Sequence, residues 1–187
     1  MNRIHHWYCG SSAWRRRVEN TLLPWALGDV AVNEPALEIG PGPGVTTDYL
    51  RTKVRSLTAL ERDPLLAEKL RARFRDTNVR VIEGDGASMP FEGGSFASVF
   101  CFTMLHHVPS REMQDRVIAE AFRVLDRGGT FVGTDSRAGW RMKLFHWFDT
   151  MVIVDPRTFP GRLKKAGFSD AQTEITAGAF RFRAVRS

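Results

Sequence analysis

Short apolar runs alternate with amphipathic stretches over most of the chain. Five of these runs lie at 36–39, 56–61, 79–83, 96–103 and 130–134, and each has the length and composition of a strand. The run at 96–103 is almost continuously apolar, which is typical of a strand that is buried on both faces. This run is therefore expected near the middle of a sheet.

Between the strands, apolar residues recur at helical spacing. The predicted helices span 11–28, 46–53, 64–75, 110–125 and 160–166. Such alternation favours parallel strands joined by right-handed crossovers, with ligands beyond the carboxyl ends of the strands. Two last runs, 171–175 and 179–186, are so close that they must form an antiparallel hairpin. The prediction is an α/β fold, a Rossmann-like three-layer sandwich: a seven-stranded, mostly parallel sheet with an antiparallel C-terminal strand and helices on both faces.

The length of 187 residues and the 43% hydrophobic content suit one globular domain. No repeat, low-complexity segment or linker divides the chain. A single domain over 1–187 is therefore expected, with an N-terminal helical lid segment (1–34), a cofactor-binding core (35–135), a lid or substrate segment (136–160), and a final helix and hairpin (161–187).

Several classes of protein are disfavoured by the composition. The longest nearly apolar stretch, 144–154, is too short to span a bilayer, and no signal-type apolar run opens the chain. No membrane span and a cytoplasmic location are expected. Cys9 and Cys101 cannot make a disulfide framework and lack metal-ligand spacing to a histidine, so no metal is expected.

The net charge of +6 is concentrated in the C-terminal third, where residues 137–187 hold 10 Lys or Arg and 4 Asp or Glu. A basic segment of this kind attracts an anionic substrate, a nucleic acid or a membrane surface, or it is a solvated arginine-rich face. No aromatic platform accompanies it, so no nucleic-acid partner is expected. The oligomeric state is not predicted.

A glycine-rich loop, Gly40-Pro41-Gly42-Pro43-Gly44, lies between the first strand and a helix. Glycine lets a ligand approach the backbone, and a helix N-terminus offers free N–H groups. Glu61 ends the second strand 21 residues after Gly40, where a carboxylate can accept hydrogen bonds from ribose hydroxyls. The pair indicates a nucleoside ligand; the alternative is a tight turn beside a surface glutamate. A dinucleotide loop would need glycine at Val45.

Six ordered motifs extend this pattern: Leu37-Glu38-Ile39-Gly40-Pro41-Gly42-Pro43-Gly44, Leu60-Glu61-Arg62-Asp63, Glu83-Gly84-Asp85-Gly86-Ala87 followed by Met89-Pro90-Phe91, Met104-Leu105-His106-His107, Arg123-Val124-Leu125-Asp126-Arg127-Gly128-Gly129, and Leu163-Lys164-Lys165-Ala166-Gly167-Phe168. Over residues 36–168 the chain resembles the class I S-adenosylmethionine-dependent methyltransferases, in the small-molecule branch (methyltransferase type 11) that includes ubiquinone/menaquinone methyltransferase-like enzymes. Arg127 departs from the family, which commonly has proline before the double glycine.

The resemblance implies S-adenosylmethionine as cofactor, S-adenosylhomocysteine as product and no metal. Glu38 would brace the loop, Gly40 and Gly42 would lie beside the amino-acid end of the cofactor, and Glu61 would hold the ribose. Asp85 would accept the adenine amine, unless it only forms an Asx-turn. The implied cofactor-binding residues are Glu38, Gly40, Gly42, Gly44, Glu61, Arg62, Asp85, Gly86, Phe102 and Thr103.

Methyl transfer from a sulfonium mainly requires alignment and a dry site, so a general base is optional. If the acceptor atom is a hydroxyl, an imidazole near neutral pKa could remove its proton. His106 and His107 follow the central strand, and His107 is the expected catalytic residue, facing the substrate. The alternative is that both histidines cap the following helix or pack under the adenine.

Aromatic residues gather in two segments outside this scaffold, 1–14 and 139–156. They suit a lid over an apolar acceptor, or alternatively they pack a helix onto the sheet. The expected substrate-contacting residues are Trp7, Tyr8, His106, Trp140 and Trp147. The predicted function is methyl transfer to a small-molecule acceptor, an O- or C-methylation of an aromatic or apolar acidic compound. The alternatives are a catalytically inactive cofactor-binding partner protein and a protein or nucleic-acid methyltransferase.

Overall fold

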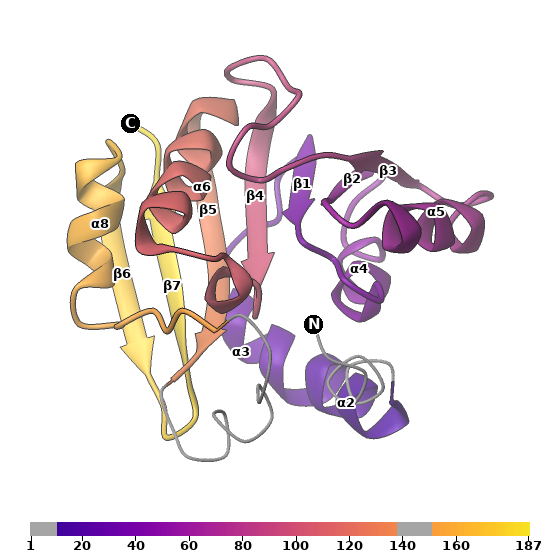
Figure 1. The fold of residues 1–187 in the computed structure, drawn as a ribbon, viewed down its shortest axis with the longest axis horizontal. Helices are drawn as coiled ribbons and strands as arrows, with labels where there is room; N and C mark the ends of the chain where they lie inside the picture. Colours follow the sequence, from indigo (N-terminus) through magenta and orange to yellow (C-terminus); the bar gives the residue numbers. More distant parts are fainter. Residues whose placement is uncertain (1–10, 138–150) are drawn as a thin grey trace.

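A computed structural model describes residues 11–137 and 151–187 of the chain. Within these ranges seven strands form one sheet in the order β3-β2-β1-β4-β5-β7-β6 (Figure 1). The strands are β1 (Ala36–Ile39), β2 (Leu57–Glu61), β3 (Val79–Glu83), β4 (Phe96–Phe102), β5 (Leu125–Ser136), β6 (Ser169–Ile175) and β7 (Ala179–Val185).

The strand directions confirm the predicted fold class. Strands β1 to β5 pair in parallel, and β7 is antiparallel to both of its neighbours, β5 and β6. The nearly continuous apolar strand β4 lies between β1 and β5, in the middle of the sheet. Because β1 to β5 share one direction, their carboxyl ends all lie at the same edge of the sheet.

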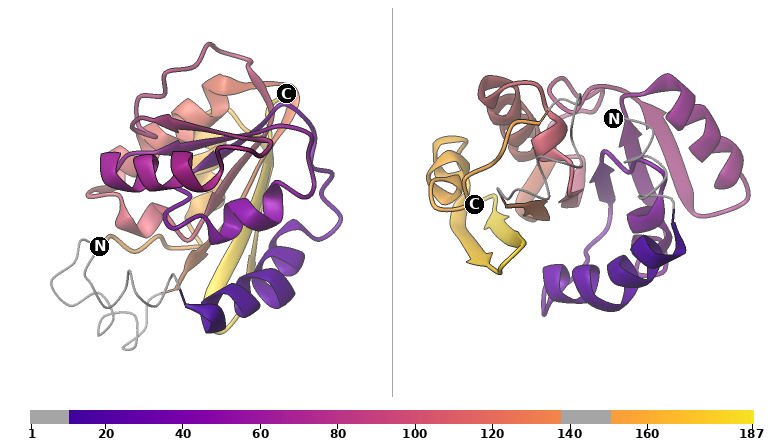
Figure 2. Two further views of the ribbon diagram at one scale, coloured as in Figure 1. Left: turned by 90° about the vertical axis from the view of Figure 1, so that its right-hand side faces the viewer. Right: turned by 60° about the horizontal axis from the view of Figure 1, so that its bottom comes forward.

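Helices cover both faces of the sheet. They are α2 (Ser12–Arg17), α3 (Leu23–Leu27), α4 (Val45–Leu50), α5 (Pro64–Arg73), α6 (Arg111–Val124) and α8 (Phe159–Lys165), with a 3₁₀ turn, η2, at Leu105–His107. Figure 2 shows α2 and α3 on the opposite side of strands β5 to β7 from α6 and α8. The fold is therefore the three-layer sandwich that was expected.

Two apolar cores separate these layers. One core combines residues of α6 and α8, such as Val117 and Leu163, with Val99 and Cys101 of β4. The other core combines residues of α2 to α5 with Phe100 and Phe102 of the same strand. Successive residues of β4 thus enter opposite cores, which is the two-sided burial that its continuous apolar sequence predicts.

The predicted helix 11–28 is interrupted in the structure. A π-helical turn, Val18–Leu22, separates α2 from α3, and the N–H of Leu23 donates to the carbonyl of Val18. Pro24 has no N–H and stands at the first turn of α3, so it cannot complete an α-helical ladder with the preceding turn.

Strand β5 is longer than the predicted run 130–134. It begins at Leu125, directly after α6, and Leu125 pairs with Phe96 of β4. Within this strand the N–H of Gly128 donates to the carbonyl of Arg186, and the N–H of Arg186 donates to the carbonyl of Gly129. Pairing with the C-terminal end of the chain therefore draws these glycines into a strand.

In the part of the chain that the structure describes, no helix is both long and apolar enough to cross a membrane. Among the same residues, no group of three or more His, Cys, Asp or Glu side chains is placed to hold a metal ion.

Candidate functional site

The predicted cofactor residues lie at or just beyond the carboxyl ends of β1, β2, β3 and β4, and the two histidines follow β4. Residue pairing aligns Ile39 with Leu60 of β2 and with Cys101 of β4. The ends of these strands are therefore level with one another, and residues far apart in sequence lie at one edge of the sheet.

The glycine loop adopts the backbone that its composition requires. Gly40, Gly42 and Gly44 have φ of 67°, 56° and 81°, which is the left-handed region that other residues rarely adopt. A Cβ on Gly40 would lie 2.3 Å from Cγ of Met104, whereas a Cβ on Gly42 would meet nothing within 4 Å. The backbone of Gly42 therefore faces space that another group could occupy.

Glu61 connects the end of β2 to this loop. The Gly42 N–H donates to Oε2 of Glu61 at 3.0 Å, and the Asp63 N–H donates to Oε1 at 2.9 Å. The residue is only 7% exposed, and burial raises the pKa of its carboxyl while the backbone N–H donors oppose that rise. Each carboxylate oxygen has further lone pairs, so Glu61 can still accept from a ligand hydroxyl.

Glu38 is buried beneath the same loop and joins β1 to the start of α4. The hydroxyl of Thr46 donates to Oε1 of Glu38, and the hydroxyl of Thr47 donates to Oε2 at 2.6 Å. Burial raises the pKa of Glu38 to about 7, although the two hydroxyl bonds lower it. This side chain therefore connects β1 to α4 on either side of the glycine loop and stabilises the conformation of the loop.

Asp85 and Arg62 lie together beyond the ends of β3 and β2. Oδ2 of Asp85 is 3.5 Å from Nε of Arg62, and both side chains are partly exposed. Oδ1 of Asp85 accepts the N–H of Ala87 at 2.9 Å, which is the geometry of an Asx-turn. Gly86 packs against β1, since a Cβ there would lie 3.0 Å from Cγ2 of Ile39.

These residues fit a bound S-adenosylmethionine. Three features follow one another along the sheet edge. The backbone of Gly42 is open to a ligand, and the carboxylate of Glu61 can accept from a ligand hydroxyl. The exposed pair Asp85–Arg62 then offers polar groups for a heterocycle. When bound, this cofactor supplies a methyl group activated by its sulfonium sulfur.

Phe102 and Thr103 lie at the end of β4. Phe102 is 4% exposed, and its ring stacks on Phe100 within the core, with 5.9 Å between the ring centroids. Thr103 has a φ of 51° and donates its N–H to the carbonyl of Thr134 at 2.8 Å. A β-branched residue rarely adopts this conformation, so the chain is strained where β4 turns toward the two histidines.

The structure adds one residue that the sequence did not indicate, Asp135. It is fully buried at the end of β5, and its carboxylate hydrogen-bonds Nδ1 of His106, which is 2% exposed. His107 is half-buried, with its ring centroid 4.1 Å from that of His106. Asp135 was missed because it directly follows the predicted strand 130–134, and no spacing rule connects it to a histidine 29 residues earlier.

Four predicted substrate residues, Trp7, Tyr8, Trp140 and Trp147, lie outside the described residues. The fifth predicted substrate residue, His106, belongs to the described residues. It lies beside Asp135, where the carboxyl ends of the parallel strands meet.

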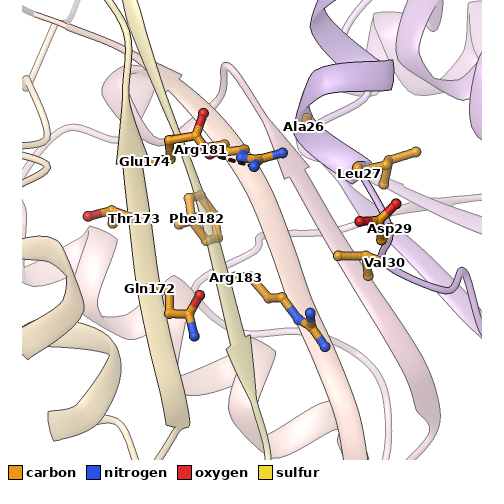
Figure 3. A pocket seen from close by; sticks show the side chains of 11 residues that line it. Ala26, Leu27, Asp29, Val30, Gln172, Thr173, Glu174, Arg181, Phe182 and Arg183 are labelled. Carbon is orange, nitrogen blue, oxygen red and sulfur yellow. Dashed lines mark hydrogen bonds and ion pairs between the residues drawn. The ribbon is translucent and has the colours of Figure 1, made fainter.

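A groove of about 440 Å³ lies elsewhere, between the end of α3 and strands β6 and β7 (Figure 3). Arg181 and Glu174 form an ion pair of 2.5 Å on its wall. Glu174 also accepts the indole N–H of Trp25 at 2.9 Å. Among residues 11–137 and 151–187, none of the predicted site residues lines this groove, so it is separate from the candidate cofactor site.

Comparison with known proteins finds similarity to methyltransferases. Residues 37–133 match the model of a family described as "Methyltransferase domain". The chain is 29% identical over 156 residues to the rice protein 2-methyl-6-phytyl-1,4-hydroquinone methyltransferase 2, chloroplastic, covering 80% of this chain and 43% of that protein. It is 41% identical over 63 residues to the probable ribosomal RNA small subunit methyltransferase A of Thermococcus onnurineus, covering 34% of this chain and 23% of that protein.

Among solved structures, a SAM-dependent methyltransferase from Aquifex aeolicus has a TM-score of 0.78 at 15% identity, with 100% of each chain covered. This similarity agrees with the observed fold. The chain spans less than half of the length of the two relatives above, 43% of the rice protein and 23% of the Thermococcus onnurineus protein.

Proposed function

This chain belongs to the methyltransferase domain family, and we propose that it transfers the methyl group of S-adenosylmethionine to a small-molecule acceptor with an aromatic or apolar acidic body. The resemblance to S-adenosylmethionine-dependent methyltransferases is confirmed by the family match and the fold. The acceptor, and the roles of individual residues, belong to the proposal.

The observation that carries the proposal is the hydrogen bond between Glu61 and the N–H of Gly42. It places an acceptor of ribose hydroxyls directly beside a glycine whose backbone is open to a ligand. In the proposal Glu61 binds the ribose, Gly40 and Gly42 lie along the amino-acid part, and Asp85 with Arg62 and Gly86 binds the adenine. Glu38 and Gly44 keep the loop in shape, while Phe102 and Thr103 border the methionyl part.

The small-molecule acceptor is favoured by the extent of the similarity. The rice protein, whose name specifies a hydroquinone, matches over 80% of this chain, whereas the ribosomal RNA methyltransferase matches over only 34%. The longer match includes more of the chain outside the shared cofactor site. In this proposal residues of 1–14 and 139–156, including Trp7, Tyr8, Trp140 and Trp147, contribute the acceptor pocket.

Calorimetry with S-adenosylmethionine and S-adenosylhomocysteine tests the cofactor, and both ligands are expected to bind. No binding of either ligand at millimolar concentration would refute the proposal. Release of S-adenosylhomocysteine is then measured with hydroquinones, phenols and apolar carboxylic acids, and in parallel with a ribosomal RNA fragment. Turnover of a small acceptor supports the proposal. Turnover of the RNA alone, or tight binding without any turnover, would replace it with one of the two alternatives.

A further inference from the structure

We propose that Gln114, oriented by Arg162, is a positioning residue for the acceptor. Its side-chain amide fixes the chain at Val152 against the turn that follows β4, and so sets the KM for the acceptor without contributing to cofactor affinity. This inference rests on the proposed function, because it assigns the positioning of the same acceptor. Neither Gln114 nor Arg162 belongs to the residues that the sequence predicts for the site.

Gln114 lies on the inner side of α6 and is only 1% exposed. Its amide nitrogen donates to the carbonyl of Leu105 at 3.0 Å and to the carbonyl of Val152 at 2.8 Å. Its Oε1 accepts from Nη1 of Arg162, on α8, at 3.0 Å. One buried side chain therefore joins α6 to the turn η2, to the chain at residue 152 and to α8.

The partners of this amide determine its orientation. The guanidinium of Arg162 can only donate, so the amide oxygen must face it. The carbonyls of Leu105 and Val152 can only accept, so the amide nitrogen must face them. The opposite orientation would place acceptor against acceptor and donor against donor, and the amide of Gln114 is therefore fixed in one way.

Arg162 is itself held in place from several sides. The residue is 9% exposed, and its Nε donates to Oδ1 of Asp115 at 2.6 Å. Its Nη2 donates to the carbonyl of Arg111 at 3.3 Å, and its guanidinium carbon lies 5.5 Å from the ring centroid of Phe159. A planar guanidinium that donates through all three nitrogens cannot rotate without losing a bond, so it keeps Oε1 of Gln114 in position.

The chain at 151–155 needs such external partners. These residues adopt neither helix nor strand, yet Val154 is fully buried (Figure 1). Backbone groups in a buried irregular segment must find hydrogen-bond partners in other elements. The N–H of Val152 donates to the carbonyl of His106 at 2.9 Å, and its carbonyl accepts from Gln114. Residue 152 is thus attached to the turn and to α6 at the same time.

The turn lies at the edge where an acceptor must meet the cofactor methyl group. It follows β4 and carries His106, one of the predicted substrate residues. On its other side, the backbone N–H of His106 donates to Oδ2 of Asp135 at 3.0 Å. The turn is therefore held from β5 and from α6 at once. A pocket that includes the turn and the segment 139–156 is pre-organised by this attachment.

The cofactor residues are outside this network. Within the described residues, no hydrogen bond links Gln114, Arg162 or Val152 to Glu61 or to Asp85. Both carboxylates instead accept from backbone groups of the loops around them. Loss of the Gln114 amide should therefore affect the acceptor and leave the cofactor unaffected.

Packing of the two helices does not require a polar network. Ile118 of α6 and Leu163 of α8 are fully buried in the same apolar core. Burying an amide and a guanidinium costs free energy that apolar side chains of similar size avoid. A satisfied polar network instead specifies one arrangement of the groups that it joins. What it specifies here is the position of residue 152 relative to the turn.

Hydrogen exchange of the Val152 amide, measured by NMR, tests the network without turnover. Gln114→Glu keeps the size of the side chain and an acceptor for Arg162, but a carboxylate cannot donate to the two carbonyls. The Val152 N–H should exchange at least about tenfold faster in this variant. The N–H of Gly40, which donates to the carbonyl of Leu60 on the cofactor side, should stay within about threefold of the parent chain.

Two further variants keep this test decisive. Val124→Ala removes apolar volume from the same helix and the same core, ten residues from Gln114, so it lowers stability without touching the network. In this control the exchange of Val152 should rise no more than that of Gly40. Arg162→Lys replaces three donor nitrogens with one, and it should accelerate Val152 in the same direction by a smaller factor. It is the test variant if Gln114→Glu does not fold.

Kinetics then use the small-molecule acceptor that gives the fastest turnover in the assay above. Gln114→Glu should raise the KM for this acceptor about tenfold or more, because a displaced pocket aligns it poorly. Calorimetry should find the dissociation constant of S-adenosylmethionine within about threefold of the parent value. Val124→Ala, assayed well below its melting temperature, should change neither quantity by more than about threefold.

Three results would overturn the proposal. Unchanged exchange at Val152 in the folded test variant would mean that the amide does not hold the segment. Equal acceleration at Val152 and Gly40 would mean that Gln114 contributes only to global stability. A loss of cofactor affinity as large as the rise in KM would mean that its effect is not confined to the acceptor. If the parent chain binds no S-adenosylmethionine, the proposed function fails, and the exchange experiment still decides the role of Gln114 in holding residue 152.

Discussion

The proposed cofactor side of this sheet edge, around Glu61, and its proposed acceptor side, around His106, are constructed in different ways. On the cofactor side, Glu61 accepts backbone N–H groups of Gly42 and Asp63, which are 19 and 2 residues away. On the acceptor side, Asp135 and His106 meet across 29 residues, and both are buried. Short-range contacts and required glycines specify the first region. In the second region, the register between β4 and β5 brings His106 and Asp135 together.

The two regions also stabilise a buried carboxyl group differently. Glu38 accepts from two threonine hydroxyls, and burial still raises its pKa to about 7. Asp135 accepts from two backbone N–H groups and an imidazole nitrogen. We therefore interpret Glu38 as a structural brace of the glycine loop. Asp135 instead connects the end of β5 to the turn that follows β4, through the backbone and the ring of His106.

The largest expected effect is that of Gly40→Ala on the cofactor side. Its Cβ would lie 2.3 Å from Cγ of Met104 at a φ of 67°, so unfolding should become easier by about 3 to 5 kcal/mol. Gly42→Ala has a φ of 56° but open space, and should cost only about 1 to 2 kcal/mol. Urea denaturation measures both, with Gly161→Ala, where nothing lies within 4 Å, as the control. Equal costs at 40 and 42 would mean that the contact with Met104 does not constrain the loop.

The second prediction concerns the pH dependence of stability at Glu38. Because the folded pKa of about 7 lies above the ordinary pKa of 4.5 for a glutamate, the folded state holds this proton more tightly. The contribution of Glu38 to stability therefore falls as the pH rises from about 4.5 to 7. Above pH 7, Glu38→Gln should be more stable than the parent chain by up to about 3 kcal/mol, and the two should be alike near pH 4.

Glu174→Gln is the matched control for that experiment. Hydrogen bonds from Trp25 and Arg181 lower the pKa of Glu174, so any difference should have the opposite sign, with the parent chain the more stable at neutral pH, and should disappear as the pH falls. If Glu38→Gln runs parallel to the parent chain at every pH, burial does not raise the pKa of Glu38 in the folded protein, and the interpretation of Glu38 is wrong.

The third prediction is the loss of ribose binding in Glu61→Ala. Removal of a charge-assisted acceptor should weaken S-adenosylmethionine binding by about 1.5 to 3 kcal/mol, or about tenfold to 150-fold. Glu83 occupies the matching position of the next strand and pairs with Glu61 in register, so Glu83→Ala serves as the control. An unchanged dissociation constant for Glu61→Ala in a folded protein would remove Glu61 from the site.

The difference between the two regions also explains what the sequence could predict. The glycines of the loop from Gly40 to Gly44 indicate a left-handed backbone, and Glu61 follows at the spacing that is typical of a nucleoside site. The sequence therefore predicts that this loop and Glu61 lie together. Asp135 carries no local signal, because a single acidic residue after an apolar run is typical of a strand end. The start of β5 at Leu125 was missed for the same reason, since its pairing with Phe96 and the contacts of Gly128 with Arg186 are not local.

The smallest expected effect on cofactor binding is that of deleting residues 1–10. This deletion tests whether the N-terminal segment belongs to the proposed acceptor side or to the proposed cofactor side. These residues lie outside the described part of the chain and include Trp7 and Tyr8, which the proposal assigns to the acceptor pocket. The deletion keeps Ser11, whose hydroxyl accepts the N–H of Trp14 at 3.2 Å and caps α2. Calorimetry should therefore show a loss of cofactor affinity of less than about tenfold, or about 1.4 kcal/mol, while methyl transfer to the identified acceptor is abolished. If cofactor binding disappears instead, the N-terminal segment belongs to the cofactor side. If methyl transfer persists, the acceptor pocket must be formed by other residues.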